Sequence, residues 1–364
     1  MANMHASRAG FDYLETVPMP NTEKDGPLSR KPSHVTPNRV VAITGSSSFL
    51  GRNLVGLLEE DPKVRRILSL DTTAPTTAGS KTSHLVTDLT HPSAEARLAD
   101  LFRIEQVTDL VHLAFVASPV QNTDWAHETE SIGTLRVVNA CRRTNVRKLV
   151  MWSQTLLYGA HPTNPNFLTE EHALRARRDE PFFANKMEAE NDVLRFGRPG
   201  SGRLATVLRT AAILGPTVNN FLTRYLGHTA VPTVLGFDPL WQFVHEADAV
   251  RAFKLALDHD APGPVNIVGE GVLPLSSVVK LAGRIALPLP RPLGDAITSA
   301  LWLARFADMP ATFLDYLQYL CVADGERAAR LLGFNAAYTT REALLDYASA
   351  QRQREAKLMV EKPA

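Results

Sequence analysis

Two glycines flank a run of small residues that has the composition of a phosphate-binding turn. Gly45 and Gly51 enclose Ser46, Ser47, Ser48, Phe49 and Leu50. The apolar run 40–44 before them is typical of a buried parallel strand, and leucines at helical spacing follow. Free N–H groups and the dipole at a helix N-terminus bind phosphate. Ser48 stands where a third glycine would bring the backbone closer, so this turn alone does not specify a nucleotide.

The ends of further predicted strands extend this site. Asp71 ends the strand 66–71, twenty residues after Gly51. An acid there accepts hydrogen bonds from the adenosine ribose hydroxyls and disfavours the 2′-phosphate of NADP, which predicts NAD as the cofactor. The alternative is an aspartate that only opens a turn. Residues after the third and fourth strands would flank the adenine and the far side of the cofactor: Asp88, Leu89, Leu113, Ala114 and Phe115.

Strands and helices alternate through the first part of the chain. Predicted strands occupy 40–44, 66–71, 84–88, 110–114, 148–152 and 204–208, and predicted helices occupy 49–60, 94–103, 125–143 and 183–195. This rhythm predicts an α/β fold with a Rossmann-type, doubly wound parallel sheet, which binds ligands outside the carboxyl ends of its strands.

The regular alternation of predicted strands and helices ends at Gly215-Pro216, which marks a domain boundary. Prolines then interrupt predicted helices near 246–258, 276–285 and 311–320. We expect a flexible leader at 1–37, a dinucleotide-binding domain at 38–216 with return segments near 241–269, a smaller substrate lobe at 217–350, and a charged tail at 351–364. The apolar residues 301–303 are expected to pack in a core, the alternative being that they widen the pocket for an apolar substrate.

The net charge, the cysteine content and the apolar segments limit which partners and locations are expected. The net charge of +1 over 364 residues gives no electrostatic reason to expect nucleic acid or a membrane surface as a partner. The two cysteines lie far apart, and no His or Cys residues fall at metal-ligand spacing, so no metal site is expected. No signal peptide is recognisable, and charges and a proline interrupt the apolar stretch 293–320. These features predict a soluble, cytoplasmic protein.

These residues resemble the extended short-chain dehydrogenase/reductases, the NAD-dependent epimerase/dehydratase family. The resemblance runs from Arg39 to about residue 345. Beyond the turn, Asp71 and Asp88-Leu89, it rests on Gly133-Thr134, Tyr158-Gly159, Lys186 with Glu190, Leu208-Arg209, Gly215-Pro216, Phe243-Val244-His245 with Asp248, Asn266-Ile267 and the segment 322–334. It implies a Rossmann fold, NAD and a homodimer formed through the helices 125–143 and 183–195.

The resemblance also implies hydride transfer between nicotinamide and an alcohol or ketone, by an oxidoreductase or isomerase. A tyrosine is the family's acid/base, a lysine four residues later holds the nicotinamide ribose and lowers the tyrosine pKa, and a Ser or Thr hydrogen-bonds the substrate oxygen. Lys186 matches the lysine. Phe182 occupies the tyrosine position, and Gln154, four residues before Tyr158, occupies the Ser/Thr position.

Three interpretations of this departure remain open. The first is catalysis with Tyr158, Thr155, Ser153 or a water as the acid/base near Lys186. The second is chemistry that needs no phenol. The third is NAD(H) binding without turnover, as in a sensor or scaffold.

The substrate predicted for an enzyme is a nucleotide sugar or another hydroxylated small molecule. Besides Gln154 and Phe182, three residues of the later segments are candidates for contacting it. Arg224 is expected either to bind a diphosphate or to be plain surface charge, and Asn219 either to bind substrate or to shape its loop. His245 is expected at the pocket wall, with Asp248 in a structural role.

Overall fold

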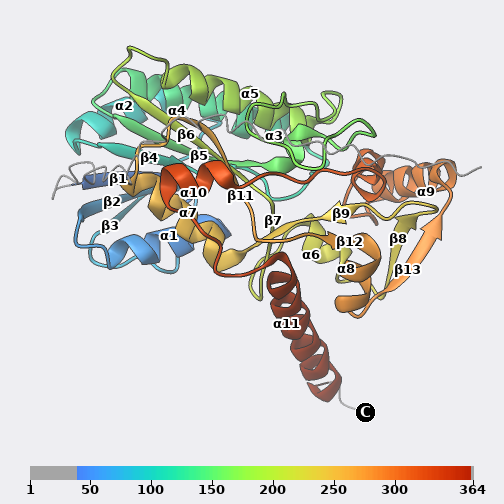
Figure 1. Cartoon of the computed structure of the whole chain (residues 1–364). Coiled ribbons are helices and arrows are strands. Elements are labelled where there is room, and N and C mark those ends of the chain that lie inside the picture. The colour runs from blue at the N-terminus through green and yellow to red at the C-terminus, as the bar shows by residue number, and fades with distance from the viewer. Residues whose placement is uncertain (1–38, 362–364) are drawn as a thin grey trace, which may run out of the picture. The chain divides into compact units, whose positions relative to one another are not determined.

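The computed structural model describes residues 39–361, so the predicted leader lies outside the described residues. Seven parallel strands form the central sheet in the order β11-β6-β5-β4-β1-β2-β3 (Figure 1). Their bounds are β1 (Arg39–Thr44), β2 (Val64–Asp71), β3 (Thr82–Val86), β4 (Asp109–His112), β5 (Lys148–Gln154), β6 (Leu204–Thr210) and β11 (Gly263–Ile267). The order reverses beside β1, which confirms the predicted doubly wound sheet.

Helices cover both faces of this sheet. Figure 1 shows α2 (Ala94–Ile104), α4 (Gly133–Arg142) and α5 (Pro181–Phe196) over one face, and α1 (Phe49–Glu59), α7 (Glu246–Asp258) and α10 (Glu326–Leu332) over the other. Every residue of β1, β4 and β5 is buried, because two helical layers exclude water from both sides.

The predicted helix 125–143 is not one regular helix. It consists of α3 (Thr123–His127), a π-helical turn η1 (Glu128–Ile132) and α4. A π-helical turn shifts the side chains that follow it around the helix axis, and such turns are frequent at functional sites. η1 brings Glu130 and Ser131 to the buried side.

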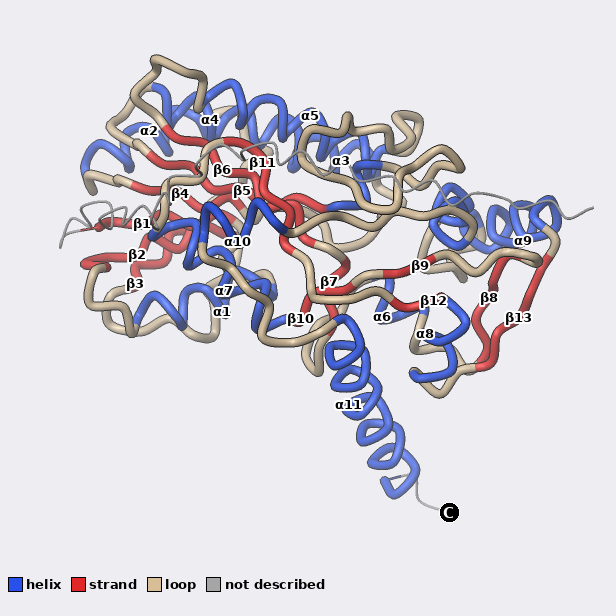
Figure 2. The backbone as a smooth tube through the Cα atoms, in the orientation of Figure 1, coloured by secondary structure: helices blue, strands red, loops and turns tan. Residues whose placement is uncertain are grey.

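The substrate lobe is built from short pairs of strands, seen as separate red segments in Figure 2. β7 (Ala212–Leu214) pairs with β10 (Phe243–His245), β8 (Ala230–Val234) with β13 (Ile285–Leu289), and β9 (Leu240–Trp241) with β12 (Leu273–Pro274). The remaining elements are η2 (Thr155–Tyr158), α6 (Phe221–Tyr225), α8 (Leu275–Leu281), α9 (Arg291–Leu303), η3 (Ala311–Leu317) and α11 (Thr340–Glu361).

Several predictions for this lobe need correction. The predicted helix 311–320 is a 3₁₀ helix that ends at Leu317, and the predicted helix 276–285 ends at Leu281 because β13 begins at Ile285. Residues 351–361 of the expected tail are the second half of α11. No helix within residues 39–361 is long and apolar enough to cross a membrane.

The expectation that residues 301–303 pack in a core is wrong. Leu301 is 43% exposed and Leu303 is 79% exposed. The buried residues of α9 are Gly294 and Thr298, and Gly294 faces Leu314 of η3. The helix therefore packs through its small residues and leaves its larger apolar side chains outside.

Candidate functional site

The turn between β1 and α1 has the backbone geometry that phosphate binding requires. Gly45 has φ +68°, and a Cβ there would lie 2.5 Å from the carbonyl carbon of Leu113, the residue directly after β4. A Cβ on Gly51 would meet the backbone of Gly45, so both glycines are needed for this close packing. Ser48 is the N-cap of α1, and its Oγ accepts from the Gly51 N–H at 3.1 Å. The serine in place of the third glycine thus stabilises the helix start.

Asp71, the last residue of β2, accepts hydrogen bonds from this turn. Its Oδ2 accepts from the Ser47 N–H at 2.9 Å and from the Ser47 hydroxyl at 2.7 Å, while Oδ1 accepts from the Thr72 N–H at 2.7 Å. The carboxylate is only partly buried and keeps further lone pairs for a ligand. A close-packed glycine turn beside a carboxylate acceptor fits the adenosine diphosphate half of NAD, with a free 2′-hydroxyl.

A hydrogen-bonded chain runs from β1 to η1 below this turn. The Thr134 hydroxyl donates to the Glu130 carbonyl, so its oxygen accepts from His112 Nε2–H at 2.7 Å. His112 Nδ1 then accepts from the Thr44 hydroxyl at 2.6 Å. Burial lowers the pKa of His112 to about 3, so the imidazole is neutral. This chain fixes the backbone of Glu130.

Lys186 and Glu130 form a buried ion pair. Lys186 Nζ donates to Glu130 Oε1 at 2.7 Å, and the Val116 N–H donates to the same oxygen at 2.8 Å. Lys186 is 1% exposed and Glu130 0%. Nζ also lies 3.8 Å from the centroid of the Phe182 ring, a cation–π contact. Burial lowers the pKa of Lys186, and the Glu130 charge opposes that shift.

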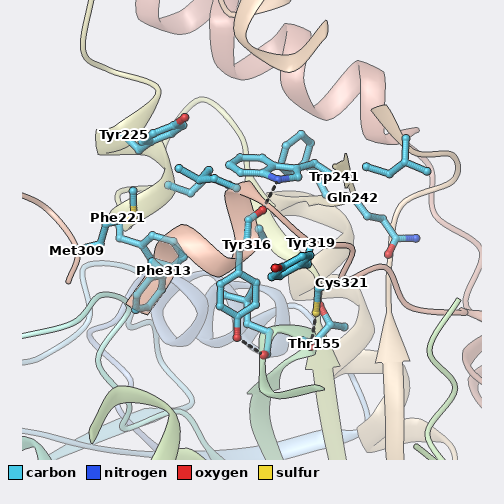
Figure 3. Close-up of a pocket in the computed structure, with 16 residues that line it drawn as sticks. Thr155, Phe221, Tyr225, Trp241, Gln242, Met309, Phe313, Tyr316, Tyr319 and Cys321 are labelled. Atoms are coloured by element: carbon cyan, nitrogen blue, oxygen red, sulfur yellow. Dashed lines mark hydrogen bonds between the residues drawn. The ribbon is translucent and has the colours of Figure 1, made fainter. Parts of the chain in front are cut away.

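Two adjacent cavities lie in this region, one beside the turn and one within the substrate lobe. The turn cavity spans about 640 Å³, a volume that includes open solvent, and its lining includes Ser48, Phe115, Gln154 and Asn219. The aromatic cavity, also about 640 Å³ and partly open, is lined by Tyr225, Trp241, Phe243, Phe313, Tyr316 and Tyr319, among others (Figure 3). Leu156, Ala212, Phe221 and Leu222 line both cavities, so the two are adjacent.

Comparison with known proteins agrees with this geometry. A profile of the NAD-dependent epimerase/dehydratase family matches residues 41–268. The chain belongs to this family. An uncharacterized protein of Mycobacterium tuberculosis is 30% identical over 85% of this chain and 83% of its own length. The UDP-glucuronic acid decarboxylase 3 of Arabidopsis thaliana is 24% identical over 74% of this chain and 81% of its own length.

Solved structures share the fold at low sequence identity. MoeE5 in complex with UDP-glucuronic acid and NAD has a TM-score of 0.66 and 22% identity, covering 86% of this chain and 99% of its own. The dTDP-glucose 4,6-dehydratase DesIV of Streptomyces venezuelae, with NAD and TYD bound, has a TM-score of 0.67 and 17% identity over 87% of this chain and 98% of its own. The predicted cofactor, NAD, is the one on which the family depends.

Most of the predicted cofactor residues lie at the carboxyl ends of the parallel strands, as expected. Phe49, Leu50 and Phe115 line the turn cavity together with Ser48. Leu113 and Leu89 are buried in the sheet core. Ala114 packs against that core, and Asp88 accepts from Thr90.

The Tyr158 hydroxyl is bonded to two other side chains. It donates to Asn266 Oδ1 at 2.8 Å and accepts from Arg209 Nη1 at 2.9 Å, and Arg209 is in turn paired with Glu190. Burial raises the pKa of Tyr158, and its side chain is absent from the described lining of both cavities. Thr155 lines the aromatic cavity. The Ser153 hydroxyl is buried with no partner within the described residues.

The candidate substrate residues are scattered. Gln154 and Asn219 line the turn cavity. Arg224 pairs with Asp308 at 2.8 Å and lines a separate polar hollow with His228 and Arg354. His245 caps α7, its Nε2 lies 3.0 Å from Asp346 Oδ2, and its ring stacks on Tyr338. Asp248 accepts from the Ala337 and Tyr338 N–H groups.

Glu130 is the residue that sequence reasoning missed. It lies 56 residues before Lys186, inside a segment expected to be an ordinary helix. The available signal was an acid three residues before the Gly133-Thr134 pair, on a helix face that the fold buries. A buried acid requires a partner, and Lys186 was already expected at this site. Within residues 39–361, no three His, Cys, Asp or Glu side chains are grouped as metal ligands.

Proposed function

We propose that this protein binds NAD(H) without the phenol-mediated proton transfer of its family. The observation that carries the proposal is the state of Lys186. Its ammonium is 2.7 Å from Glu130 Oε1, and the Phe182 ring lies over it at 3.8 Å, where the family's catalytic scheme needs a tyrosine hydroxyl. A phenyl ring neither gives nor accepts a proton, and the ion pair already satisfies the lysine charge.

The adenosine half of the site supports retained binding. The N–H groups of the turn 45–51 would hold the diphosphate, and the partly exposed Asp71 would accept from the adenosine ribose. NAD, when bound, supplies a hydride donor or acceptor. The Tyr158 hydroxyl is not free to exchange a proton with a substrate of that cofactor, because Arg209 and Asn266 already bind it.

Two measurements test this proposal together. NADH and NADPH are titrated by cofactor fluorescence, and absorbance at the nicotinamide band is then followed with alcohols, ketones and nucleotide sugars. We expect saturable NADH binding, weaker NADPH binding and no turnover. Failure to bind NADH would overturn the proposal.

A second candidate is an enzyme acting on a nucleotide sugar or another hydroxylated small molecule by a route without Tyr. Its support is the turn cavity, where Gln154 Oε1 is buried without a partner in the described chain. An amide there is available to hold a substrate. Turnover with any member of the panel would favour this candidate. Phe182→Tyr sharpens the test, because activity gained by that variant would show that a substrate already reaches the site.

We also propose a cytoplasmic homodimer. The family resemblance supports a pairing of α4 and α5, which lie side by side over one face of the sheet (Figure 1). Light scattering on the purified protein tests this, and a monomeric mass would exclude the dimer.

A further inference from the structure

We propose that the aromatic cavity and the turn cavity together bind a neutral, largely hydrocarbon alcohol or ketone that contains a flat ring. Its ring would occupy the aromatic cavity, and its oxygen would meet Gln154 in the turn cavity. This inference goes beyond cofactor binding. Because Ser48, Phe49 and Leu50 of the predicted cofactor site also line the turn cavity, the two are separated by measuring ligand binding with and without NAD.

The walls of the aromatic cavity favour a hydrocarbon. Aromatic and aliphatic side chains from α6, β9, β10 and η3 surround it (Figure 3), and no described lining residue of either cavity carries a charge. The rings of Phe221 and Phe313, which both line this cavity, contact each other at a centroid distance of 5.0 Å. Such rings stack well on a flat apolar ligand.

The polar atoms of this cavity are mostly bonded within the protein. Trp241 Nε1 donates to the Tyr316 carbonyl at 3.0 Å, and the Tyr316 hydroxyl donates to the Leu156 carbonyl at 2.7 Å (Figure 3). The Gln242 amide binds the backbone of Ala323 in both directions, and the Tyr225 hydroxyl donates to the Pro232 carbonyl. The hydroxyls of a sugar would find few partners here, so their loss of water would go largely uncompensated.

Gln154 gives the site its polar end. The side chain is 7% exposed, lines the turn cavity, and has an amide oxygen without a partner among residues 39–361. A buried, unsatisfied amide is uncommon in native proteins and calls for a partner. One hydroxyl or carbonyl on the ligand would provide it, since the amide group both accepts and donates.

The absence of charge in the described lining of the aromatic cavity argues against a nucleotide diphosphate in that cavity. Binding a diphosphate requires cations or free N–H groups, and the free N–H groups beside the turn cavity are those of the turn 45–51, which are assigned to the cofactor. Arg224 is paired with Asp308 and lines the other hollow, while Arg209 is buried against Glu190. The ligand class that fits is therefore neutral.

Calorimetry with 2-naphthol, naphthalene and UDP-glucose tests the proposal, each with and without NAD. We expect 2-naphthol to bind about tenfold or more tightly than UDP-glucose, even without NAD. Naphthalene should bind more weakly than 2-naphthol, because it lacks the oxygen that meets Gln154. Tighter binding of UDP-glucose to the wild type would overturn the proposal. Loss of NADH binding alone would overturn only the cofactor assignment.

Two surface-compatible variants localise the ligand. Leu240 lines the aromatic cavity yet is 37% exposed, whereas Leu235 is 57% exposed and absent from that lining. Leu240→Arg should weaken 2-naphthol binding about tenfold, and the matched Leu235→Arg should leave it unchanged. Gln154→Leu should abolish the preference for 2-naphthol over naphthalene. Equal effects of the two arginine variants, or an unchanged preference in Gln154→Leu, would contradict the assigned pose.

Discussion

The two ends of the candidate cofactor site differ in how much of their chemistry remains available to a ligand. At the adenosine end, the Gly45–Gly51 turn is tightly packed, and Asp71 is partly exposed with lone pairs to spare. At the other end, Lys186 is paired with Glu130 out of reach of solvent, beneath the Phe182 ring, and Glu130 Oε2 has no partner among the described residues. The comparison teaches that binding a cofactor and using it are separate properties of this fold.

The largest effect is expected where the buried ion pair is broken. Glu130→Gln leaves the Lys186 ammonium buried without a countercharge, which should lower the free energy of unfolding by about 3–5 kcal/mol. Urea denaturation measures it. Glu171→Gln is the control, because Glu171 is an exposed acid away from the ion pair. A change below about 1 kcal/mol would mean that the pair is not buried as described.

A nearly as large effect is expected at the adenosine end. Gly45→Ala forces a side chain into a positive φ and against the Leu113 carbonyl. Strain of about 1–3 kcal/mol, before the clash, should reduce NADH affinity about a hundredfold or more. Gly200→Ala is the matched control, since Gly200 has φ +84° and open space around its Cβ position. The NADH affinities of the two variants are measured by titration. Equal affinities of Gly45→Ala and Gly200→Ala would contradict a role for the turn in binding NADH.

The hydrogen-bonded chain between the two ends should give a pH dependence. The folded pKa of His112 is about 3, below its value of 6.5 in the unfolded chain. The unfolded state therefore binds more protons between those values, and stability falls as pH drops from 6.5 towards 3. At pH 4.5 the loss should be about 2–3 kcal/mol. The difference in unfolding free energy between wild type and His112→Gln, followed against pH, isolates this term; parallel curves would refute it.

The smallest effect concerns the choice between NAD and NADP. Asp71→Asn removes the charge that disfavours a 2′-phosphate, while its amide keeps an acceptor for Ser47. NADH affinity should fall about tenfold, and the preference for NADH over NADPH should shrink. Asp100→Asn, at an exposed position of α2, serves as the control. An undiminished preference would show that Asp71 only opens a turn.

The sequence predicts the sheet and the turn well because their signals are local. Apolar runs such as 40–44 become strands buried on both faces, and glycine spacing marks the turn that only glycine can form. Asp71 follows from its distance to that turn. The departure at Phe182 is likewise visible from position alone.

The rest depends on contacts between distant segments. The π-helical turn at Glu128–Ile132 has no local breaker, and the pairing of Glu130 with Lys186 arises only when α5 packs beside η1. The exposure of the apolar face of α9 could not be predicted either, because the spacing of apolar residues along a helix is the same whether that face is buried or exposed. Tyr158 matched a family motif, but its partners Arg209 and Asn266 come from β6 and β11.

The most direct test removes the ion pair as a whole. In the double variant Glu130→Leu/Lys186→Met no unpaired charge is left, so the fold is expected to persist. If Lys186 pairs with Glu130 and does not bind the cofactor, the NADH affinity measured by fluorescence titration will stay within about twofold of that of the wild type. A loss of about tenfold or more in a folded variant would show that Lys186 holds the cofactor, and would contradict the account.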